Sequence, residues 1–195
     1  MTSSEKGRLI IISAPSGAGK TTLVNYLMDK DLDLEFSVSA TTREPRDGEE
    51  NKRHYHFITT SEFRKRIRKG DFVEWEEVYR DQLYGTLREE IERIFRKGKN
   101  VLFDVDVKGG IKLKNIFGHK ALSVFIKPPS VGELEKRLIL RGTDSPEKIK
   151  MRVEKALEEI ELADCFDYTV INDRLEQARK EIYTIIKNFI ERQDE

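Results

Sequence analysis

The residues best suited to chemistry form a phosphate-binding loop near the start of the chain, Ala14-Pro15-Ser16-Gly17-Ala18-Gly19-Lys20-Thr21. Small residues let this loop curl so that successive backbone N–H groups face phosphate oxygens, and the following helix adds its unpaired N-terminal donors. Lys20 is expected to bridge the β- and γ-phosphates of ATP, and the Thr21 hydroxyl to ligate Mg²⁺. Alanine stands at position 14 in place of the usual first glycine, at little cost in an extended backbone. The loop predicts an ATP site that includes Thr22, against the alternative of a glycine-rich turn that binds nothing.

A second group of residues could bind another molecule that carries phosphate, one that accepts a group from ATP. Arg43 and Arg46 flank Glu44-Pro45, and Tyr55 follows shortly after them. Two guanidinium groups suit a phosphate dianion, because each can donate two parallel hydrogen bonds, and the proline stiffens the loop between them. The two arginines taken alone would also fit a solvated basic turn.

Two carboxylates, Asp104 and Asp106, end a buried apolar run in the sequence Phe103-Asp104-Val105-Asp106. Side chains two apart on a strand share a face, and ligands of parallel α/β sheets bind beyond the carboxyl ends of the strands. Both carboxylates are therefore expected to point into the site. A simple turn at the strand end is the alternative, which Gly109-Gly110 would also fit.

With these motifs in this order, the chain resembles the guanylate kinase family from about Arg8 to Ile190. The resemblance implies transfer of the γ-phosphoryl group of MgATP to GMP, giving ADP and GDP, in purine nucleotide metabolism and GMP recycling, with dGMP as a further acceptor. It implies that Mg²⁺ is the cofactor, held by Thr21 and, partly through water, by Asp104. The residues implied to be catalytic are Lys20, Arg43, Arg137, Arg141 and Arg152.

The same resemblance assigns the acceptor site. Arg43 and Arg46 would enclose the GMP phosphate together with the hydroxyls of Tyr55 and Tyr84. The guanine would contact Ser39, Glu74 and Thr86, with Asp106 nearby on the acceptor side; the family commonly has serine where this chain has Thr86. A carboxylate can accept both N1–H and N2–H₂ of guanine, whereas adenine offers no such donor pair. A surface role for Glu74 is the alternative, since Glu76 and Glu77 stand beside it.

A second set of arginines follows in the segment 131–152. Arg137 and Arg141 are four residues apart and share a helical face, and Arg152 lies beyond Gly142. The resemblance implies that they belong to a mobile lid, which would neutralise charge in the transition state and displace water. Ordinary surface positions on a Lys/Glu-rich helix are the alternative. The segment Val170-Ile171-Asn172-Asp173 resembles the one that contacts the donor adenine, which assigns Asn172 to that role.

Apolar runs that alternate with amphipathic stretches predict an α/β fold, a P-loop NTPase-like parallel sheet flanked by helices. Strands are predicted at Leu9–Ser13, Val101–Val105, Ala121–Ile126 and Tyr168–Ile171, and helices at Lys20–Asp29, Ser61–Lys69, Leu87–Lys97, Val131–Arg141, Pro146–Leu162 and Leu175–Arg192. Short strands at His54–Ile58, Phe72–Val78 and Leu83–Gly85 predict an inserted α+β subdomain. Ser61 is expected to cap its helix, and Gly70 and Gly98 to end theirs.

These elements predict a single domain over residues 7–190, with terminal tails at 1–6 and 191–195. Its core is expected at 7–35, 91–129 and 153–190, its GMP-binding insertion at about 36–90, and its helical lid at about 130–152.

Composition limits the class of protein. The 195 residues carry 36 basic and 36 acidic side chains, so no overall field favours nucleic acid or membrane as a partner. The single cysteine, Cys165, excludes an intrachain disulfide and suits a reducing compartment. The longest apolar run, Leu9–Ile12, is far shorter than the ~18 residues of a membrane span, and residues 1–7 lack the apolar segment of a secretory signal. We therefore expect a cytoplasmic protein that acts on small molecules.

Two other functions stay open at the level of sequence. Guanylate-kinase-like domains also serve as protein-interaction scaffolds, although those commonly have degraded phosphate loops. A kinase with the same core could accept another nucleotide or a sugar phosphate. His54 and His56 lack a third ligand at a matching spacing, and Cys165 lacks an activating partner, so none of them predicts a site. The sequence does not decide between a monomer and a homo-oligomer.

Overall fold

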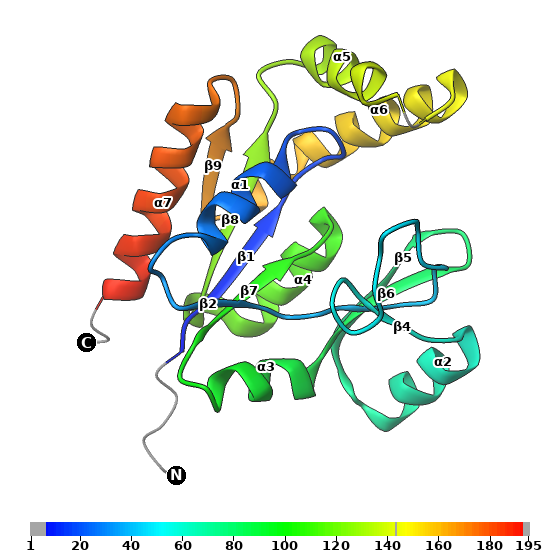
Figure 1. Ribbon diagram of the computed structural model, residues 1–195, viewed down its shortest axis with the longest axis vertical. Coiled ribbons are helices and arrows are strands. Elements are labelled where there is room, and N and C mark those ends of the chain that lie inside the picture. The colour runs from blue at the N-terminus through cyan, green and yellow to red at the C-terminus, as the bar shows by residue number, and fades with distance from the viewer. Residues whose placement is uncertain (1–6, 143, 193–195) are drawn as a thin grey trace.

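The computed structural model describes residues 7–142 and 144–192, and its centre is a five-stranded sheet with the strand order β2-β7-β1-β8-β9. The strands are β1 (Leu9–Ser13), β2 (Leu34–Phe36), β7 (Asn100–Asp104), β8 (Ala121–Lys127) and β9 (Tyr168–Ile171). Every neighbouring pair is parallel, so all five carboxyl ends point toward one edge of the sheet. β1 runs through the middle of this sheet (Figure 1). The parallel sheet confirms the α/β class predicted from the sequence.

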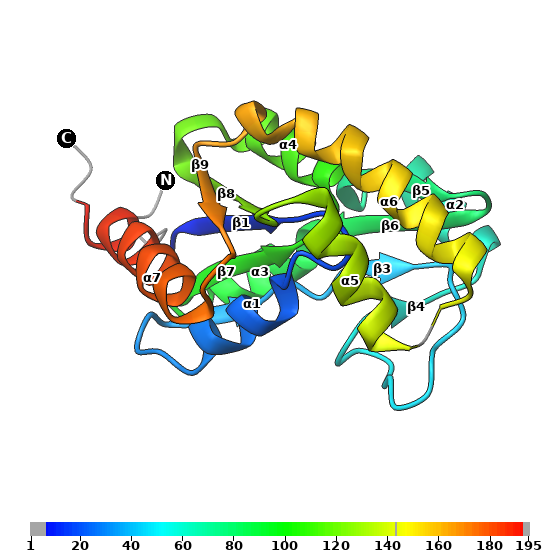
Figure 2. The same ribbon diagram turned by 90° about the horizontal axis from the view of Figure 1, so that it is seen from above.

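Alternation along the strands explains why helices cover both faces of the central sheet. Ile10 and Ile12 of β1 belong to a cluster that includes side chains of α1 (Lys20–Met28) and α7 (Leu175–Glu191). Leu9 and Ile11 belong to the opposite cluster, which includes side chains of α3 (Arg88–Phe95) and α4 (Val107–Phe117). Figure 2 shows α1 and α7 on one side of the sheet and α4 on the other. The central strand is thus buried on both faces, which makes its carboxyl end a rigid support for the loop that follows.

A second sheet lies beside the first and has the strand order β4-β3-β6-β5. It consists of β3 (Ala40–Thr41), β4 (His56–Phe57), β5 (Phe72–Tyr79) and β6 (Gln82–Leu87), with α2 (Thr60–Lys69) packed against it. β5 and β6 form an antiparallel hairpin, and β3 pairs antiparallel with β6. Phe63 of α2 stacks on Phe72 of β5 with 4.4 Å between the ring centroids. This small core of its own keeps the second sheet together apart from the central one.

Two further helices, α5 (Val131–Arg141) and α6 (Pro146–Glu161), pack against each other beyond the carboxyl ends of the central strands (Figure 1). Each begins at a serine cap: Ser130 accepts from the Glu133 N–H at 3.1 Å, and Ser145 accepts from the Lys148 N–H at 3.4 Å. Short helical turns, η1 (Gly118–Lys120) and η2 (Ala163–Cys165), complete the described elements. In the part of the chain that the structure describes, no helix is long and apolar enough to cross a membrane.

Most predicted elements are confirmed. β1, β9 and α5 have the predicted bounds, and α1, α6 and α7 differ from them by one residue. The predicted cap of α2 was wrong: the helix begins at Thr60 because the Thr59 hydroxyl accepts from the Glu62 N–H at 3.2 Å. Gly70 ends α2 as expected, in a left-handed conformation with φ of 72°. β2 and β3 were not predicted, because strands of three and two residues carry no readable periodicity.

The sequence also failed to predict α4, because Gly109-Gly110 suggested a turn. In the structure both glycines lie in the first turn of this helix, which the Asp106 side chain caps by accepting from the Gly109 N–H at 3.3 Å. A Cβ at Gly110 would lie 2.4 Å from Ser13 Oγ at the end of β1. The glycine is therefore a packing requirement of a helix that passes close to the sheet, not a helix breaker.

Candidate active site

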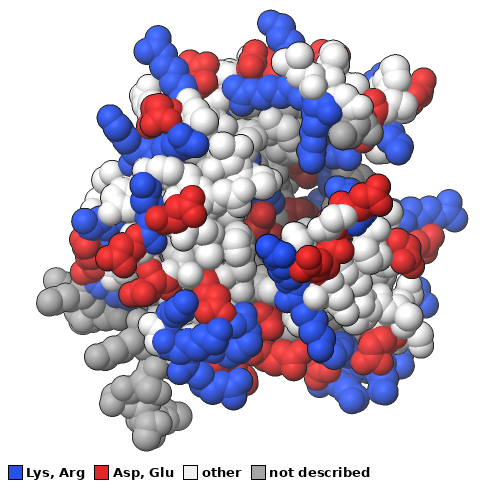
Figure 3. All heavy atoms as spheres, viewed as in Figure 1, with Lys and Arg blue, Asp and Glu red and all other residues white. Residues whose placement is uncertain are grey.

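A cavity of about 600 Å³ lies at the carboxyl edge of the central sheet, where the second sheet and the α5–α6 pair also contribute walls. Figure 3 shows the molecule hollowed between these parts, with Lys and Arg side chains on the rim. Most residues predicted to act in the site line this cavity: Ala14, Pro15, Ser16, Gly17, Gly19, Lys20, Thr21, Thr22, Ser39, Arg46, Tyr55, Glu74, Tyr84, Asp104, Asp106, Arg137, Arg141 and Arg152. Residues from distant parts of the sequence are thus brought to one site.

Four predicted residues lie behind the lining: Ala18, Arg43, Thr86 and Asn172. Ala18 and Thr86 are fully buried, and Asn172 is buried as well. Arg43 and Thr86 each hydrogen-bond to a lining side chain, Tyr84 and Glu74 respectively. The structure therefore places these two next to the cavity rather than on its surface.

The phosphate loop has the backbone that its sequence predicts. Gly17 and Gly19 have φ angles of 92° and 93°, a conformation that glycine adopts readily and other residues rarely do. The side-chain amide of Asn172 donates to the Ala18 carbonyl at 2.8 Å, and a Cβ at Gly19 would lie 2.2 Å from the same amide nitrogen. Asn172 thus supports the loop from behind. Its predicted contact with the donor base stays a prediction.

Lys20 extends from the start of α1 toward the end of β7. Its ammonium nitrogen lies 2.5 Å from Oδ1 of Asp104 and donates to the Val105 carbonyl at 2.9 Å. Burial would lower the pKa of Lys20, but the Asp104 carboxylate outweighs it and raises the pKa above the ordinary value. The lysine is therefore a fixed cation beside the phosphate loop.

Arg43 is held in place by a carboxylate that the sequence analysis did not single out, Glu49. Arg43 donates to both oxygens of Glu49, at 2.8 and 2.9 Å, and its Nε donates to the Tyr84 hydroxyl at 3.2 Å. The guanidinium also lies 5.4 Å from the ring centroid of Tyr55. Glu49 further accepts from the backbone N–H of Arg46 at 2.7 Å. One carboxylate thus organises both arginines predicted to bind the acceptor phosphate.

Glu74 is a buried carboxyl group that faces the cavity from β5. The Thr86 hydroxyl donates to it at 2.7 Å from the neighbouring strand β6. Burial, with a smaller contribution from the nearby Asp106, raises the pKa of Glu74 to about 7, against the lowering effect of the Thr86 hydrogen bond. Glu74 accepts one hydrogen bond from a hydroxyl group, so its carboxylate can accept further hydrogen bonds from a ligand, as the guanine assignment requires.

The α5–α6 helix pair contacts the phosphate loop and Asn172, which supports the loop. Arg152 donates to the Ser16 hydroxyl at 2.7 Å and pairs with Asp144, whose carboxylate lies 3.1 Å from its Nε. Arg137 donates to the Asn172 carbonyl at 3.1 Å. The Leu138 side chain also lies against Gly17, where a Cβ would come within 3.1 Å of it. The helix pair therefore contacts the loop through polar and apolar groups together.

Comparison with known proteins identifies the family of this chain. A sequence model of the family described as guanylate kinase matches residues 6–189. The chain is 53% identical over 184 residues to a guanylate kinase of Porphyromonas gingivalis, covering 94% of this chain and 98% of that protein. The chain belongs to the guanylate kinase family.

Further relatives agree with this membership. A guanylate kinase of Bacteroides thetaiotaomicron is 50% identical over 187 residues, which cover 96% of this chain and 92% of that protein. The crystal structure of guanylate kinase from Anaplasma phagocytophilum has a TM-score of 0.78 at 29% identity, over 96% of this chain and 88% of that one. The predicted family, P-loop α/β fold and enzyme class, a nucleoside monophosphate kinase, are confirmed.

Among the lining residues that the sequence analysis missed are two from α6, Lys155 and Glu159. They follow Arg152 at spacings of three and seven, so helical periodicity places all three on one face, and this was the available signal. Burial raises the pKa of Glu159, which Lys155 at 3.4 Å opposes. Glu49 follows Arg43 by six residues in an irregular segment, where spacing gives no comparable signal.

The cofactor expected of a guanylate kinase is Mg²⁺, and the residues present fit it. The described residues contain no group of three or more His, Cys, Asp or Glu side chains that could hold a metal by themselves. Mg²⁺ commonly takes only one or two protein oxygens and completes its shell with water and substrate phosphates. Thr21, Asp104 and Asp106 supply oxygens of this kind along the cavity, where the Asp104 carboxylate already pairs with the Lys20 ammonium.

Proposed function

We propose that the protein transfers the γ-phosphoryl group of ATP to GMP, forming ADP and GDP, and that it accepts dGMP as well. The observation that carries the proposal is the common cavity, which the phosphate loop lines from one side and Glu74 from the other. The names of the relatives, guanylate kinases of Porphyromonas gingivalis and Bacteroides thetaiotaomicron, support GMP as the acceptor.

Each part of the fold has a proposed role in this reaction. The core, residues 7–35, 91–129 and 153–190, would hold ATP. The segment of about 36–90, which forms the second sheet, would hold GMP. The segment of about 130–152 would act as the lid, a role supported by its contacts with the phosphate loop through Leu138 and Arg152.

Binding would depend on two sets of cations. Lys20 and the backbone N–H groups of the loop would hold the β- and γ-phosphates, which requires the lysine to exchange the Asp104 carboxylate for phosphate oxygens. Arg43 and Arg46 would hold the acceptor phosphate, with the Tyr55 and Tyr84 hydroxyls. Ser39, Glu74 and Thr86 would contact the guanine, and Asp106 would lie on the acceptor side. Thr21 and, partly through water, Asp104 would hold Mg²⁺, which would supply further neutralisation of the phosphate charge.

Transfer itself would be a direct in-line displacement. The acceptor phosphate oxygen is already ionised near neutral pH, since the second pKa of a phosphate monoester is about 6, so no general base is required. Arg137, Arg141 and Arg152 would neutralise the charge that develops on the transferred group. Catalysis would then consist of positioning and charge neutralisation, and no residue would become phosphorylated.

A panel of acceptors tests the proposal. Purified protein is incubated with MgATP and, separately, GMP, dGMP, AMP, CMP or UMP, and the products are resolved by anion-exchange chromatography. We expect ADP and the nucleoside diphosphate in equal amounts with GMP and dGMP only. Equal use of AMP and GMP would overturn the role of Glu74, and folded protein that turns over no member of the panel would refute the proposed activity.

A further inference from the structure

The chain crosses between the central sheet and the second sheet twice, and both crossings meet at Glu90. The first crossing leaves β2 at Phe36 and enters β3 at Ala40, and the second leaves β6 at Leu87 and enters α3 at Arg88. Glu90 lies in the first turn of α3, two residues after the second crossing enters this helix, and its side chain is buried. A buried carboxylate at the junction of two parts of a protein requires donors that offset its desolvation.

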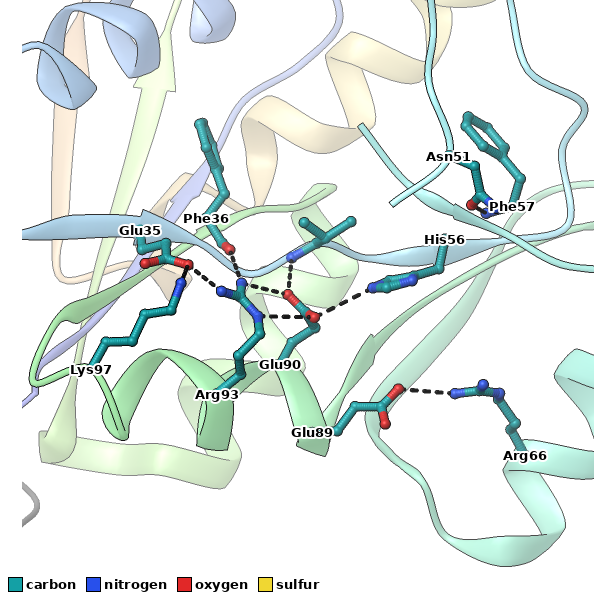
Figure 4. A network of polar contacts seen from close by, with 11 residues as sticks. Glu35, Phe36, Asn51, His56, Phe57, Arg66, Glu89, Glu90, Arg93 and Lys97 are labelled. Carbon is teal, nitrogen blue, oxygen red and sulfur yellow. Dashed lines mark hydrogen bonds and ion pairs between the residues drawn. The ribbon is translucent and has the colours of Figure 1, made fainter. Parts of the chain in front are cut away.

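Groups from the first crossing, from α3 and from β4 surround the Glu90 carboxylate (Figure 4). The Val38 N–H of the first crossing donates to Oε2 at 3.2 Å. Arg93, one turn further along α3, donates to Oε1 at 3.2 Å and to Oε2 at 2.8 Å. His56 of β4 places its Nε2 3.4 Å from Oε1, which is an ion-pair distance rather than a hydrogen bond. Burial would raise the pKa of Glu90, but these donors lower it to about 2, so the group is a carboxylate throughout the neutral range.

Arg93 fastens this junction to the central sheet. Besides Glu90, it donates to the Glu35 carboxylate and, at 3.3 Å, to the Phe36 carbonyl at the end of β2. Lys97, two residues beyond the end of α3, also pairs with Glu35, at 2.7 Å. Arg93 therefore anchors Glu90 to the central sheet. Val38 and His56, which Glu90 also contacts, belong to the side of the second sheet.

Val38 and His56 are the chain neighbours of two residues that line the cavity. Ser39 follows Val38, and its carbonyl accepts from the His56 N–H at 2.9 Å. Tyr55 precedes His56 in the chain, and both Ser39 and Tyr55 line the cavity. Glu90 thus holds the two neighbours of these lining residues at once, through one backbone donor and one imidazole.

We infer that Glu90 is a positioning residue for the acceptor half of the site, which acts through Val38 and His56 on Ser39 and Tyr55. The inference rests on the proposed function, in which that half binds GMP. It adds that the orientation of the acceptor residues is set from the core by a buried carboxylate outside the cavity, at the point where the second sheet joins the central one.

The substitution Glu90→Gln tests the inference. It keeps the shape of the side chain, but it replaces one carboxylate oxygen by an NH₂ group and removes the negative charge. We expect the KM for GMP to rise about tenfold, the effect of losing one hydrogen bond to a charged group, with kcat and the KM for ATP changed less than about twofold. Glu89→Gln is the matched control: it removes one charge from the same helical turn, but its carboxylate binds Arg66 at 3.1 Å and its side chain is 63% exposed. We expect its kinetics to match the parent protein.

A second pair of variants separates positioning from folding. His56→Gln keeps a donor near the position of Nε2, whereas His56→Ala removes it. We expect His56→Ala to raise the KM for GMP and His56→Gln to restore it to within about twofold of the parent value. If circular dichroism shows that Glu90→Gln is unfolded, the two His56 variants still test the positioning role. Equal effects of the two His56 variants, or equal rises in the KM values for GMP and ATP, would overturn the inference.

The parent protein, assayed in parallel, distinguishes this inference from the function on which it rests. A folded parent that does not phosphorylate GMP refutes the proposed function. A parent that phosphorylates GMP, together with a folded Glu90→Gln variant of unchanged KM for GMP, refutes the positioning role alone.

Discussion

The ammonium nitrogen of Lys20 lies 2.5 Å from Oδ1 of Asp104, so the predicted phosphate-binding lysine is paired with the predicted metal-organising carboxylate. Both side chains line the cavity, and their exposed fractions are 23% and 33%. In the proposed reaction each group takes a new partner of opposite charge, the lysine from ATP and the aspartate from the cofactor. The pair therefore holds both groups in the site before they act.

The substitution Lys20→Ala is expected to abolish turnover while leaving the fold intact. It removes the cation that would bridge the β- and γ-phosphates, which we expect to lower kcat on the order of 1,000-fold, or ~4 kcal/mol of transition-state stabilisation. The measurement is kcat under saturating MgATP and GMP, with circular dichroism as the check on folding. Near-normal turnover would contradict the assignment of the phosphate loop.

The substitution Asp104→Asn is expected to raise the Mg²⁺ concentration needed for half-maximal turnover by about tenfold, because it removes the charge that would help to hold the ion. Turnover is measured as Mg²⁺ is varied at fixed ATP and GMP. Asp164→Asn serves as a control, since Asp164 is exposed and lies in η2, outside the cavity lining. An unchanged Mg²⁺ requirement in Asp104→Asn would exclude this aspartate from the metal site.

The substitution Glu49→Gln is expected to weaken GMP binding although Glu49 does not line the cavity. It disrupts the two-oxygen contact that orients Arg43, so we expect the KM for GMP to rise about five- to tenfold, with the KM for ATP unchanged. Steady-state kinetics with each substrate varied in turn measure this. Glu50→Gln is the neighbouring control, because Glu50 pairs with Arg53 and its side chain is 63% exposed. A loss of the same size in both variants would point to general charge effects.

The affinity for GMP is expected to fall as the pH is lowered through about 7, the raised pKa of Glu74. The ionised carboxylate can accept both guanine donors, whereas the protonated group presents a donor of its own to one of them. Isothermal titration of GMP between pH 6 and pH 8.5 measures the effect. An affinity that does not change with pH over this range would contradict the assignment of Glu74 to the guanine.

Glu74→Gln controls for the titration of the GMP phosphate, because only the Glu74 contribution disappears in this variant.

The same substitution has a predicted effect on stability. The folded-state pKa of about 7 lies above the ordinary 4.5, so the folded protein binds the proton more tightly and loses stability as the pH rises from 4.5 to 7. Removing the carboxylate should therefore raise the free energy of unfolding at pH 8 by an amount on the order of 1–3 kcal/mol. This gain would be measured as a higher melting temperature. A lower melting temperature at pH 8 would contradict this linkage.

The sequence predicted most of the central fold and many of the residues that line the cavity, because both depend on short motifs. A buried strand, a glycine-rich loop and Lys20 are adjacent in the chain, so local patterns were sufficient to find them. Glycine was read wrongly in α4, since the close contact between Gly110 and Ser13 depends on two segments packing together. Glu49 and Glu90 could not be found by spacing, because they act on Arg43 and Val38 only after the chain has folded.

The order of strands in the central sheet has a consequence for the synthesis of the chain. β1 emerges first from the ribosome, yet both of its neighbours, β7 and β8, lie in the second half of the sequence. The bond from Asn172 to the Ala18 carbonyl, which spans 154 residues, closes later still. At ~5–20 residues per second, the apolar first strand waits roughly 8 to 30 s before the loop that follows it can be supported. The apolar strand β1 is therefore made long before its two neighbours in the sheet, and during this time its exposed apolar surface can aggregate or bind chaperones.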